Sequence, residues 1–396
     1  MLKIQKKDGS IEAFSSQKIV SAIRKSANRA MYDLSDEQCR RVVDLTLAHL
    51  AEHGGDVAPV ANVHNAVERA LDDVAPDVAK CYRDYRNYKQ DFVHMLDDVY
   101  RKSQAIRYIG DRNNANTDSA LVPTQRSLIY NELSSALYKK FFLNREEREA
   151  MKDGYIYIHD RSARLDTMNC CLFDMENVLT GGFEMGNVWY NEPKTLDVAF
   201  DVISDVAISA AACQYGGFTI PEVDKILAPY AEKSYQKYFE EYTEIAVYNN
   251  LGDHEDVLTA ADEYAVKKVQ RDMEQGFQSW EYRFNTVGSS RGDYPFIAVS
   301  FGLDNSRFGR MASMTCMNVR AGGQGAAGHK KPVLFPKLTF LYDEELHGEG
   351  KPMEDVFECG VDCSTKAMYP DFLSLTGEGY IPSMYKKYGR VVSLMG

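Results

Sequence analysis

Two adjacent cysteines near the middle of the chain are the residues whose types point most directly to chemistry. Cys170 and Cys171 stand in the string MNCCLFD, shortly after the string GYIYIHD, which ends in His159 and Asp160. A thiol can react or give up its hydrogen, whereas a buried cysteine is usually an inert packing residue. Neighbouring side chains on an extended backbone point to opposite faces, so Cys171 fits packing if Cys170 faces a site. The dipeptide alone leaves both interpretations open.

Four other residues of this region are candidates for contacts with a ligand. His159 and Asp160 end the run 155–160, which we predict to be a strand, and ligand contacts are common where strands end. A capping aspartate and a hydrogen-bonded core histidine would explain them equally well. Gly216 and Gly217 in CQYGGFTI would let backbone amides approach a phosphate, although tight helix packing would also explain them.

Several further residues carry weaker signals. The string FNTV at 284–287 and Arg291 are candidates for the polar lining of a site, and Asp166 receives no role. Cys359 and Cys363 are spaced to share one helical face and are expected to be structural. No CxxC motif occurs, so we assign no metal site.

Lysines near the N-terminus suggest a second kind of site. Lys6 and Lys7 stand in KKDGS, and Lys18 follows in the next predicted helix. A triphosphate needs several converging cations, and these three would converge across a hairpin and a helix. Lysines beside a hairpin are also commonly just solvated, so the pattern needs further support. His64 either contacts the same ligand or lies at the edge of the core.

The composition limits the class of protein. The chain has 396 residues with 46 basic and 58 acidic side chains, a net charge of −12, which argues against nucleic acid as the main partner. No apolar run approaches the roughly 18 residues that would span a membrane, and no signal peptide is recognisable. The eight cysteines are too sparse for a disulfide scaffold, so we expect a reducing, cytoplasmic setting.

The elements that must position these residues fall into two groups. In the first group, LKIQ and IEAF flank KKDGS as a hairpin, with positive φ expected at both Asp8 and Gly9. Four amphipathic helices follow: one capped by Ser15 or Ser16, one opened by a Ser35–Gln38 capping box, one through Val60–Val74 and one from Pro76. The second helix is expected to bury Leu47 along with Val42, Val43 and Leu50.

The second group begins after residues 101–120, which are polar and turn-rich and predict a linker or loop. Long helical stretches then alternate with the apolar runs 155–160, 295–302 and 333–342, and a helix over 195–213 carries an apolar stripe. This alternation is typical of an α/β core. We therefore expect a domain over 1–95, a linker over 96–120 and an α/β domain over 121–396.

The first domain resembles the ATP-cone, the regulatory domain at the front of many ribonucleotide reductases. Two basic residues, a glycine turn, an aromatic residue and a Lys-Ile pair make the match, through Lys6, Lys7, Gly9, Phe14 and Lys18. The resemblance implies that the hairpin covers an adenine nucleotide, with ATP promoting and dATP suppressing activity. His64 falls where the cone has a nucleotide-contacting histidine.

The second domain resembles the anaerobic, glycyl-radical (class III) ribonucleoside-triphosphate reductases. Its matching strings are GYIYIHD, MNCCLFD, LTGGFEMGN, CQYGGFTI, ILAPY, EYRFNTV, PFIAVSFG, LFPKLTF and KAMYPDFL. The resemblance implies the first half of a ten-stranded α/β barrel. It makes Cys170, which follows Asn169, the catalytic thiol that delivers a hydrogen atom to a ribose radical. His159, Asn169, Gly216 and Gly217 become candidate substrate contacts.

The resemblance also implies partners. The substrates would be ribonucleoside triphosphates, reduced for DNA synthesis and repair with formate or a thiol as electron source, and an S-adenosylmethionine iron–sulfur activase would generate the glycyl radical. In the family the thiyl cysteine, a structural zinc site and the radical glycine follow the run that ends here at Gly396. We therefore expect this chain to be inactive without a C-terminal half, as a truncated, split or intein-interrupted product. The complete enzyme is expected to form a homodimer or larger oligomer.

A protein of another class remains as an alternative. A non-catalytic nucleotide-sensing regulatory protein would keep the cone with a decayed barrel. The presence of Cys170 and the barrel strings favours the enzyme.

Overall fold

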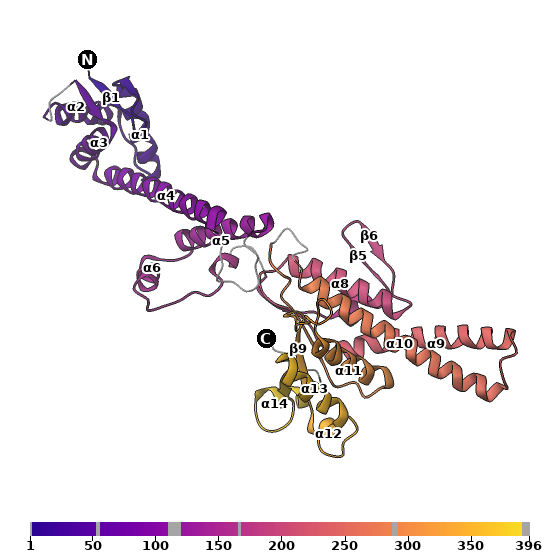
Figure 1. Cartoon of the computed structure of the whole chain (residues 1–396). Coiled ribbons are helices and arrows are strands. Elements are labelled where there is room, and N and C mark those ends of the chain that lie inside the picture. The colour runs from indigo at the N-terminus through magenta and orange to yellow at the C-terminus, as the bar shows by residue number, and fades with distance from the viewer. Residues whose placement is uncertain (1, 53–55, 110–119, 165–167, 287–291, 390–396) are drawn as a thin grey trace. The chain divides into compact units, whose positions relative to one another are not determined.

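The computed structural model describes residues 2–52, 56–109, 120–164, 168–286 and 292–389. The chain divides into two compact units, Met1–Arg101 and Lys102–Gly396, which are described separately (Figure 1).

The first unit contains a small sheet with the strand order β2-β1-β3. The predicted hairpin is confirmed: β1 (Lys3–Gln5) pairs antiparallel with β2 (Ile11–Ala13). The sequence did not predict β3 (Val57–Pro59), which pairs parallel with β1. The expected turn geometry is wrong at Asp8: only Gly9 has a positive φ, 83°. The Asp8 carboxylate instead accepts hydrogen bonds from the amide and hydroxyl of Ser10.

Helices pack beside this sheet in the first unit: α1 (Ser16–Arg29), α2 (Asp36–Ala51), α3 (Val60–Val74) and α4 (Pro76–Ile109). The Ser35–Gln38 capping box at the start of α2 is present in both directions, which confirms that prediction. Apolar residues of all four helices form one core that includes Ile23, Val42 and Leu71. Leu47 does not join it and is exposed, contrary to expectation.

The long fourth helix differs from the loop predicted for residues 101–120. It continues without a break to Ile109. The string RKSQAIRY is polar, as loops often are, but Lys, Gln, Arg and Ala are also good helix formers, and an already formed helix extends easily into such residues. The remainder of that stretch, apart from residue 120, lies outside the described residues.

The second unit starts within the last turns of α4 and continues with two helices, α5 (Val122–Phe141) and α6 (Arg145–Lys152). The strand predicted over 155–160 is wrong: these residues belong to no strand, and Tyr155 and Tyr157 are exposed. A single-turn 3₁₀ helix, Arg161–Ala163, follows.

A five-stranded sheet forms the centre of the second unit, with the order β10-β9-β8-β7-β4 and every neighbouring pair parallel. Its members are β4 (Cys171–Leu172), β7 (Phe218–Ile220), β8 (Ile297–Phe301), β9 (Lys337–Tyr342) and β10 (Asp371–Ser374). The strands predicted within 295–302 and 333–342 are therefore confirmed. All residues of β7 and β8 are buried, as expected for a parallel sheet covered by helices.

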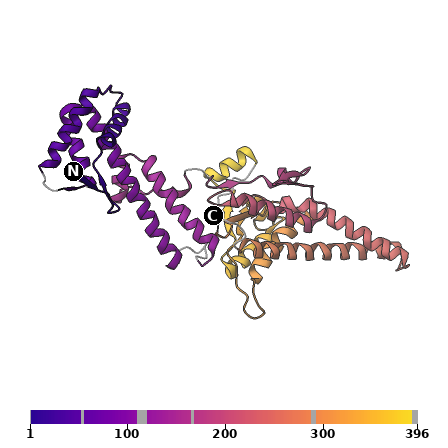
Figure 2. The ribbon, with the colours of Figure 1, turned by 90° about the horizontal axis from the view of Figure 1, so that it is seen from above.

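Helices connect and cover these strands: α8 (Leu196–Ala212), α9 (Val223–Tyr248), α10 (His254–Phe284), α11 (Arg307–Gly322) and α13 (Glu354–Ala367). Figures 1 and 2 show α9 and α10 side by side as a long helical hairpin. Its apolar inner side, with α8 and the sheet, encloses a core centred on Phe200, Phe277 and Trp280.

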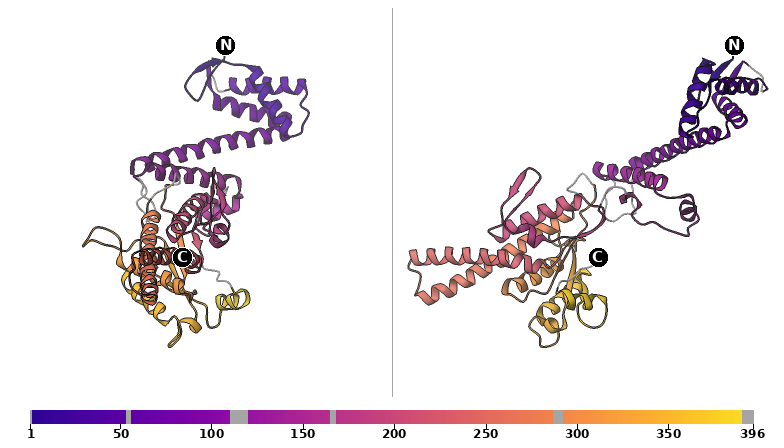
Figure 3. Two further views of the ribbon diagram at one scale, coloured as in Figure 1. Left: turned by 90° about the vertical axis from the view of Figure 1, so that its right-hand side faces the viewer. Right: turned by 180° about the vertical axis from the view of Figure 1, so that it is seen from behind.

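Shorter elements complete the second unit: α7 (Met175–Leu179), β5 (Phe183–Met185), β6 (Val188–Tyr190), α12 (Glu344–His347) and α14 (Tyr380–Tyr388). The antiparallel β5–β6 hairpin stands apart from the five-stranded sheet (Figure 3). Within the described residues, no helix has both the length and the apolar character needed to cross a membrane.

Candidate functional site

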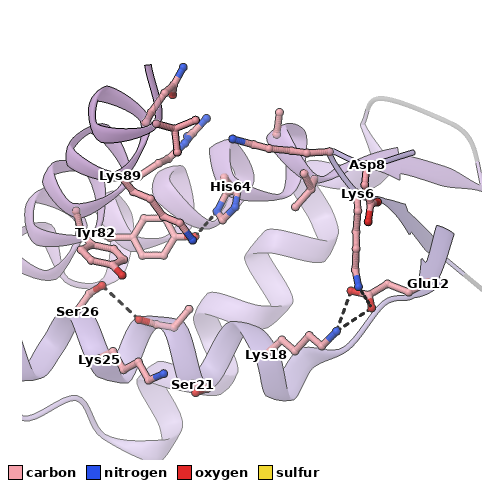
Figure 4. A pocket seen from close by; sticks show the side chains of 18 of the residues that line it. Lys6, Asp8, Glu12, Lys18, Ser21, Lys25, Ser26, His64, Tyr82 and Lys89 are labelled. Atoms are coloured by element: carbon pink, nitrogen blue, oxygen red, sulfur yellow. Dashed lines mark hydrogen bonds and ion pairs between the residues drawn. The ribbon is translucent and has the colours of Figure 1, made fainter. Parts of the chain in front are cut away.

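A large cavity of about 1260 Å³ lies within the first unit. The β1–β2 hairpin, α1, α3 and α4 all contribute lining residues, so side chains distant in sequence face one space (Figure 4). Lys6, Lys7, Lys18 and His64, which the sequence analysis singled out as candidate ligand contacts, all line it. The volume is ample for a nucleotide, since small-molecule pockets typically enclose about 300–1,000 Å³.

Two of the predicted residues have other positions. Gly9 does not line the cavity; it occupies the hairpin turn, where its positive φ suits glycine. Phe14 packs against the helical core of the first unit. Both therefore shape the hairpin that carries Lys6 and Lys7, and the structure gives neither a direct place in the cavity wall.

One carboxylate holds two of the cavity lysines. Glu12 lies between Lys6 and Lys18, with Nζ to carboxylate distances of 2.8 Å to each (Figure 4). Hydrogen bonds from Lys18 and Lys6 lower the pKa of Glu12, and its carboxylate in turn raises the pKa of Lys6. The hairpin and α1 are thereby linked at the cavity.

His64 faces the cavity from α3 and is bonded to α4. Its Nδ1 lies 2.7 Å from the hydroxyl of Tyr82. Burial, and then the charges of Arg86, Lys7 and Lys89, lower the pKa of His64. Burial raises the pKa of Tyr82 to about 12, so the phenol keeps its proton. A neutral imidazole and a neutral phenol are suited to hydrogen bonding with a ligand rather than to charge pairing.

Sequence reasoning missed four cations of the cavity: Lys25 and Arg29 on α1, and Arg86 and Lys89 on α4. A signal for them was present, because Lys18, Lys25 and Arg29 recur at helical spacing on α1. Arg86 and Lys89 likewise share a face of α4. The lining residues that the structure describes thus include seven Lys and Arg side chains against the acids Asp8 and Glu12. Such an excess of converging cations fits a polyphosphate.

The second candidate site surrounds Cys170 in the second unit. This residue is exposed and directly precedes β4, while Gly216 and Gly217 directly precede the neighbouring β7. The Gly217 amide donates a hydrogen bond to the Cys170 sulfur, N to Sγ 3.3 Å. The site therefore lies where two parallel strands begin.

Polar groups form a chain that ends at this thiol. The Cys170 sulfur lies 3.6 Å from Oδ1 of Asn169, whose Nδ2 donates to Oδ2 of Asp160 at 3.2 Å. His159 Nε2 lies 3.3 Å from the same carboxylate oxygen. The segment 159–160 is thus brought to the thiol by contacts of Asp160 with Asn169, although it is not the strand end that the sequence suggested. Asp160 adopts a left-handed φ of 51°.

Close packing against Asn169 and Cys170 requires glycine at position 216. A Cβ at Gly216 would lie 2.3 Å from the Cys170 sulfur and 2.6 Å from the Asn169 carbonyl oxygen. The amides of both glycines also have acceptors within the protein, since Gly216 N donates to the Asn169 carbonyl and Gly217 N to the sulfur. The close approach is to the Asn169–Cys170 segment directly before β4, not to a helix.

The second cysteine faces the protein interior. Cys171 is partly buried against the main core, and its thiol donates to Oε1 of Gln214 at 3.0 Å. Burial raises the pKa of Cys171. Among the weaker candidates, Asn285 holds the backbone before β9: its amide bonds the backbone of Leu334 and Phe335. Arg291 and Asp166 lie outside the described residues.

Each of the two units matches a different family of known proteins. Residues 2–91 match the model of the ATP cone domain, and residues 113–396 match that of the anaerobic ribonucleoside-triphosphate reductase. The reductase of that name from Haemophilus influenzae is 31% identical over 93% of this chain and 51% of its own length. The reductase of the same name from Escherichia coli is 30% identical over 94% of this chain and 51% of its own length. The one from phage T4 is 33% identical over 66% of this chain and 41% of its own length.

Among solved structures, the anaerobic ribonucleotide reductase from Thermotoga maritima in complex with dATP and CTP aligns with a TM-score of 0.44 at 14% identity, over 73% of this chain and 50% of that one. The chain spans about half the length of the bacterial relatives it matches. On the strength of these family matches, it belongs to the anaerobic ribonucleoside-triphosphate reductases and carries an ATP-cone domain in its first unit.

Proposed function

We propose that the cavity of the first unit binds ATP and dATP as allosteric effectors. The excess of lysines and arginines over acids around one cavity carries this proposal, together with the match to the ATP cone. The polyphosphate would bind Lys6 and Lys18, either by replacing Glu12 as their ion-pair partner or by binding them together with Glu12. His64 and Tyr82 would supply neutral hydrogen-bonding groups to the same ligand.

Calorimetric titration with ATP and with dATP tests this role. Lys18→Ala should weaken binding by roughly ten- to a hundredfold, since a charge-assisted contact to a phosphate contributes roughly 1.5–3 kcal/mol and 1.4 kcal/mol is a factor of ten. Lys80→Ala is the matched control, because Lys80 is an exposed lysine of the same unit that does not line the cavity. Equal affinity of the two variants would contradict the proposal.

We also propose that the protein reduces ribonucleoside triphosphates to deoxyribonucleoside triphosphates by radical chemistry. Cys170 would deliver a hydrogen atom to the ribose radical as the 2′-hydroxyl leaves as water, and formate or an external thiol would supply the two electrons that the overall reduction consumes. The exposure of this thiol at the start of two parallel strands, within the region that matches the reductase family, supports the assignment. His159, Asn169 and the Gly216–Gly217 backbone would shape the substrate site around it.

The finer features implied by the family are part of this proposal. The five parallel strands would form half of a ten-stranded barrel. A glycyl radical and a structural zinc would be carried outside the residues of this chain, with the radical generated by an iron–sulfur activase. The assembled enzyme would be a homodimer or larger oligomer.

The test is anaerobic formation of deoxyribonucleotides in a preparation that also supplies the remaining half of the relatives' length and the activase. Cys170→Ser should abolish product formation. Cys213→Ser, a substitution at another exposed cysteine, should leave the rate of product formation unchanged. Full activity of Cys170→Ser would overturn the assignment of the thiol. Nucleotide binding by the first unit with no turnover in any such preparation would favour a nucleotide-sensing protein instead.

A further inference from the structure

The Gly216–Gly217 segment beside Cys170 is held in place by the side chain of Gln214. This side chain is 5% exposed, and its Nε2 donates to the carbonyl oxygens of Gly216 at 3.2 Å and Gly217 at 2.8 Å. The Gly217 carbonyl also accepts from the Cys171 amide at 3.0 Å. One buried amide group therefore ties down the backbone of the glycine segment.

The orientation of that amide group depends on the second cysteine. An amide side chain has an oxygen that only accepts and a nitrogen that only donates. Cys171 donates its S–H to Oε1 of Gln214, so the NH₂ group must face the two glycine carbonyls. Without a donor at position 171, Oε1 would lose this hydrogen bond from the thiol, and the preference for this orientation would weaken.

We propose that Gln214 and Cys171 together are positioning residues for Cys170. The Cys171 thiol orients the Gln214 amide, and this amide fixes the Gly216–Gly217 backbone. The Gly217 N–H then holds the Cys170 sulfur at 3.3 Å. The adjacent cysteines thus have different tasks: one faces the site, and the other anchors the segment that holds it. The functional value of this arrangement rests on the proposed role of Cys170, but the contacts themselves are testable without turnover.

Residue-resolved amide hydrogen exchange on the full chain tests the arrangement. Gln214→Met keeps the side-chain length but removes every side-chain hydrogen bond of this residue. The Gly216 and Gly217 amides should then exchange about tenfold faster, because about 1.4 kcal/mol, roughly one neutral buried hydrogen bond, is a factor of ten. Amides in the middle of α8 should keep their rates, which distinguishes local loosening from general unfolding. Unchanged exchange at both glycines would overturn the role of Gln214.

Two variants at position 171 and one at position 170 separate the contributions. Cys171→Ala should speed exchange of both glycine amides, and Cys171→Ser should restore slow exchange because a hydroxyl also donates to Gln214. If serine behaves like alanine, Cys171 only packs, and its share of the proposal fails. Cys170→Ala should speed Gly217 but not Gly216, because only the Gly217 amide bonds the sulfur. Faster exchange at both would show that the sulfur itself holds the segment, contrary to the proposal.

These outcomes are independent of the reductase assay. If the variants show the expected exchange pattern but the reconstituted preparation forms no deoxyribonucleotide, the result would count against the proposed reaction and would leave the positioning network supported. A fully active Gln214→Met protein with fast-exchanging glycines would show that the network exists but does not serve the proposed chemistry.

Discussion

Replacing Gly216 by alanine tests the packing around the thiol most directly. The added Cβ would lie 2.3 Å from the Cys170 sulfur, 2.6 Å from the Asn169 carbonyl oxygen and 2.6 Å from Asn169 Oδ1. Two of these atoms belong to side chains that could move, but the carbonyl oxygen belongs to the backbone beside β4 and already accepts from the Gly216 amide. The strand or the glycine segment must therefore shift. Such overpacking typically destabilises by about 1–3 kcal/mol.

Tryptophan fluorescence during urea unfolding measures this loss in the relevant unit. The chain has two tryptophans, Trp189 and Trp280, and both lie in the second unit. With a slope of about 3 kcal/mol per molar urea, a loss of about 2 kcal/mol lowers the midpoint by roughly 0.7 M. Trp280 is fully buried, so its emission should report the loss of the core.

Gly322→Ala is the matched control for this experiment. Gly322 ends α11 in the same unit, and a Cβ there would meet nothing within 4 Å. The substitution should leave the midpoint unchanged or raise it slightly, because alanine restricts the unfolded chain more than glycine does. A midpoint for Gly216→Ala equal to that of Gly322→Ala would refute the close contact with Cys170.

The remaining predictions concern the half-buried His64 and one buried ion pair. Because the pKa of His64 is lowered from 6.5 in the folded protein, the unfolded chain takes up this proton first as the pH falls. The neutral His64 side chain therefore contributes its full stability above pH 6.5, and this contribution is lost as the pH falls below 6.5. Between about pH 7.5 and 5.5, His64→Gln should lose less stability in calorimetry than the unsubstituted protein does. An identical loss in both proteins would contradict the lowered pKa of His64. Arg320 and Glu281 form an ion pair that is 1% and 4% exposed, and Arg320→Met should destabilise the second unit by about 3–5 kcal/mol by leaving a buried carboxylate. The double variant with Glu281→Leu should recover most of this loss in the same fluorescence assay, and no recovery would mean that packing, not charge, dominates.

Local patterns in the sequence were sufficient for much of the helical structure. The Ser35–Gln38 capping box and the apolar spacing along α1 and α3 act over one or two turns, so they can be read without knowing the rest of the fold. The strand predicted over 155–160 failed for the opposite reason. An alternating apolar run forms a strand only where another strand supplies hydrogen bonds, and none pairs with it among the described residues.

The sequence by itself determined which side chains could do chemistry: Cys170 beside Asn169, the glycine pair, and the lysines of the hairpin. Only the tertiary structure decided how they combine. It brought Gln214 and Gly217 to the two cysteines through the parallel pairing of β4 with β7, and it placed Arg86 and Lys89 of α4 around the same cavity as the hairpin lysines. These contacts join residues far apart along the chain, and such neighbours are set by the path of the backbone and the packing of the core rather than by local propensity.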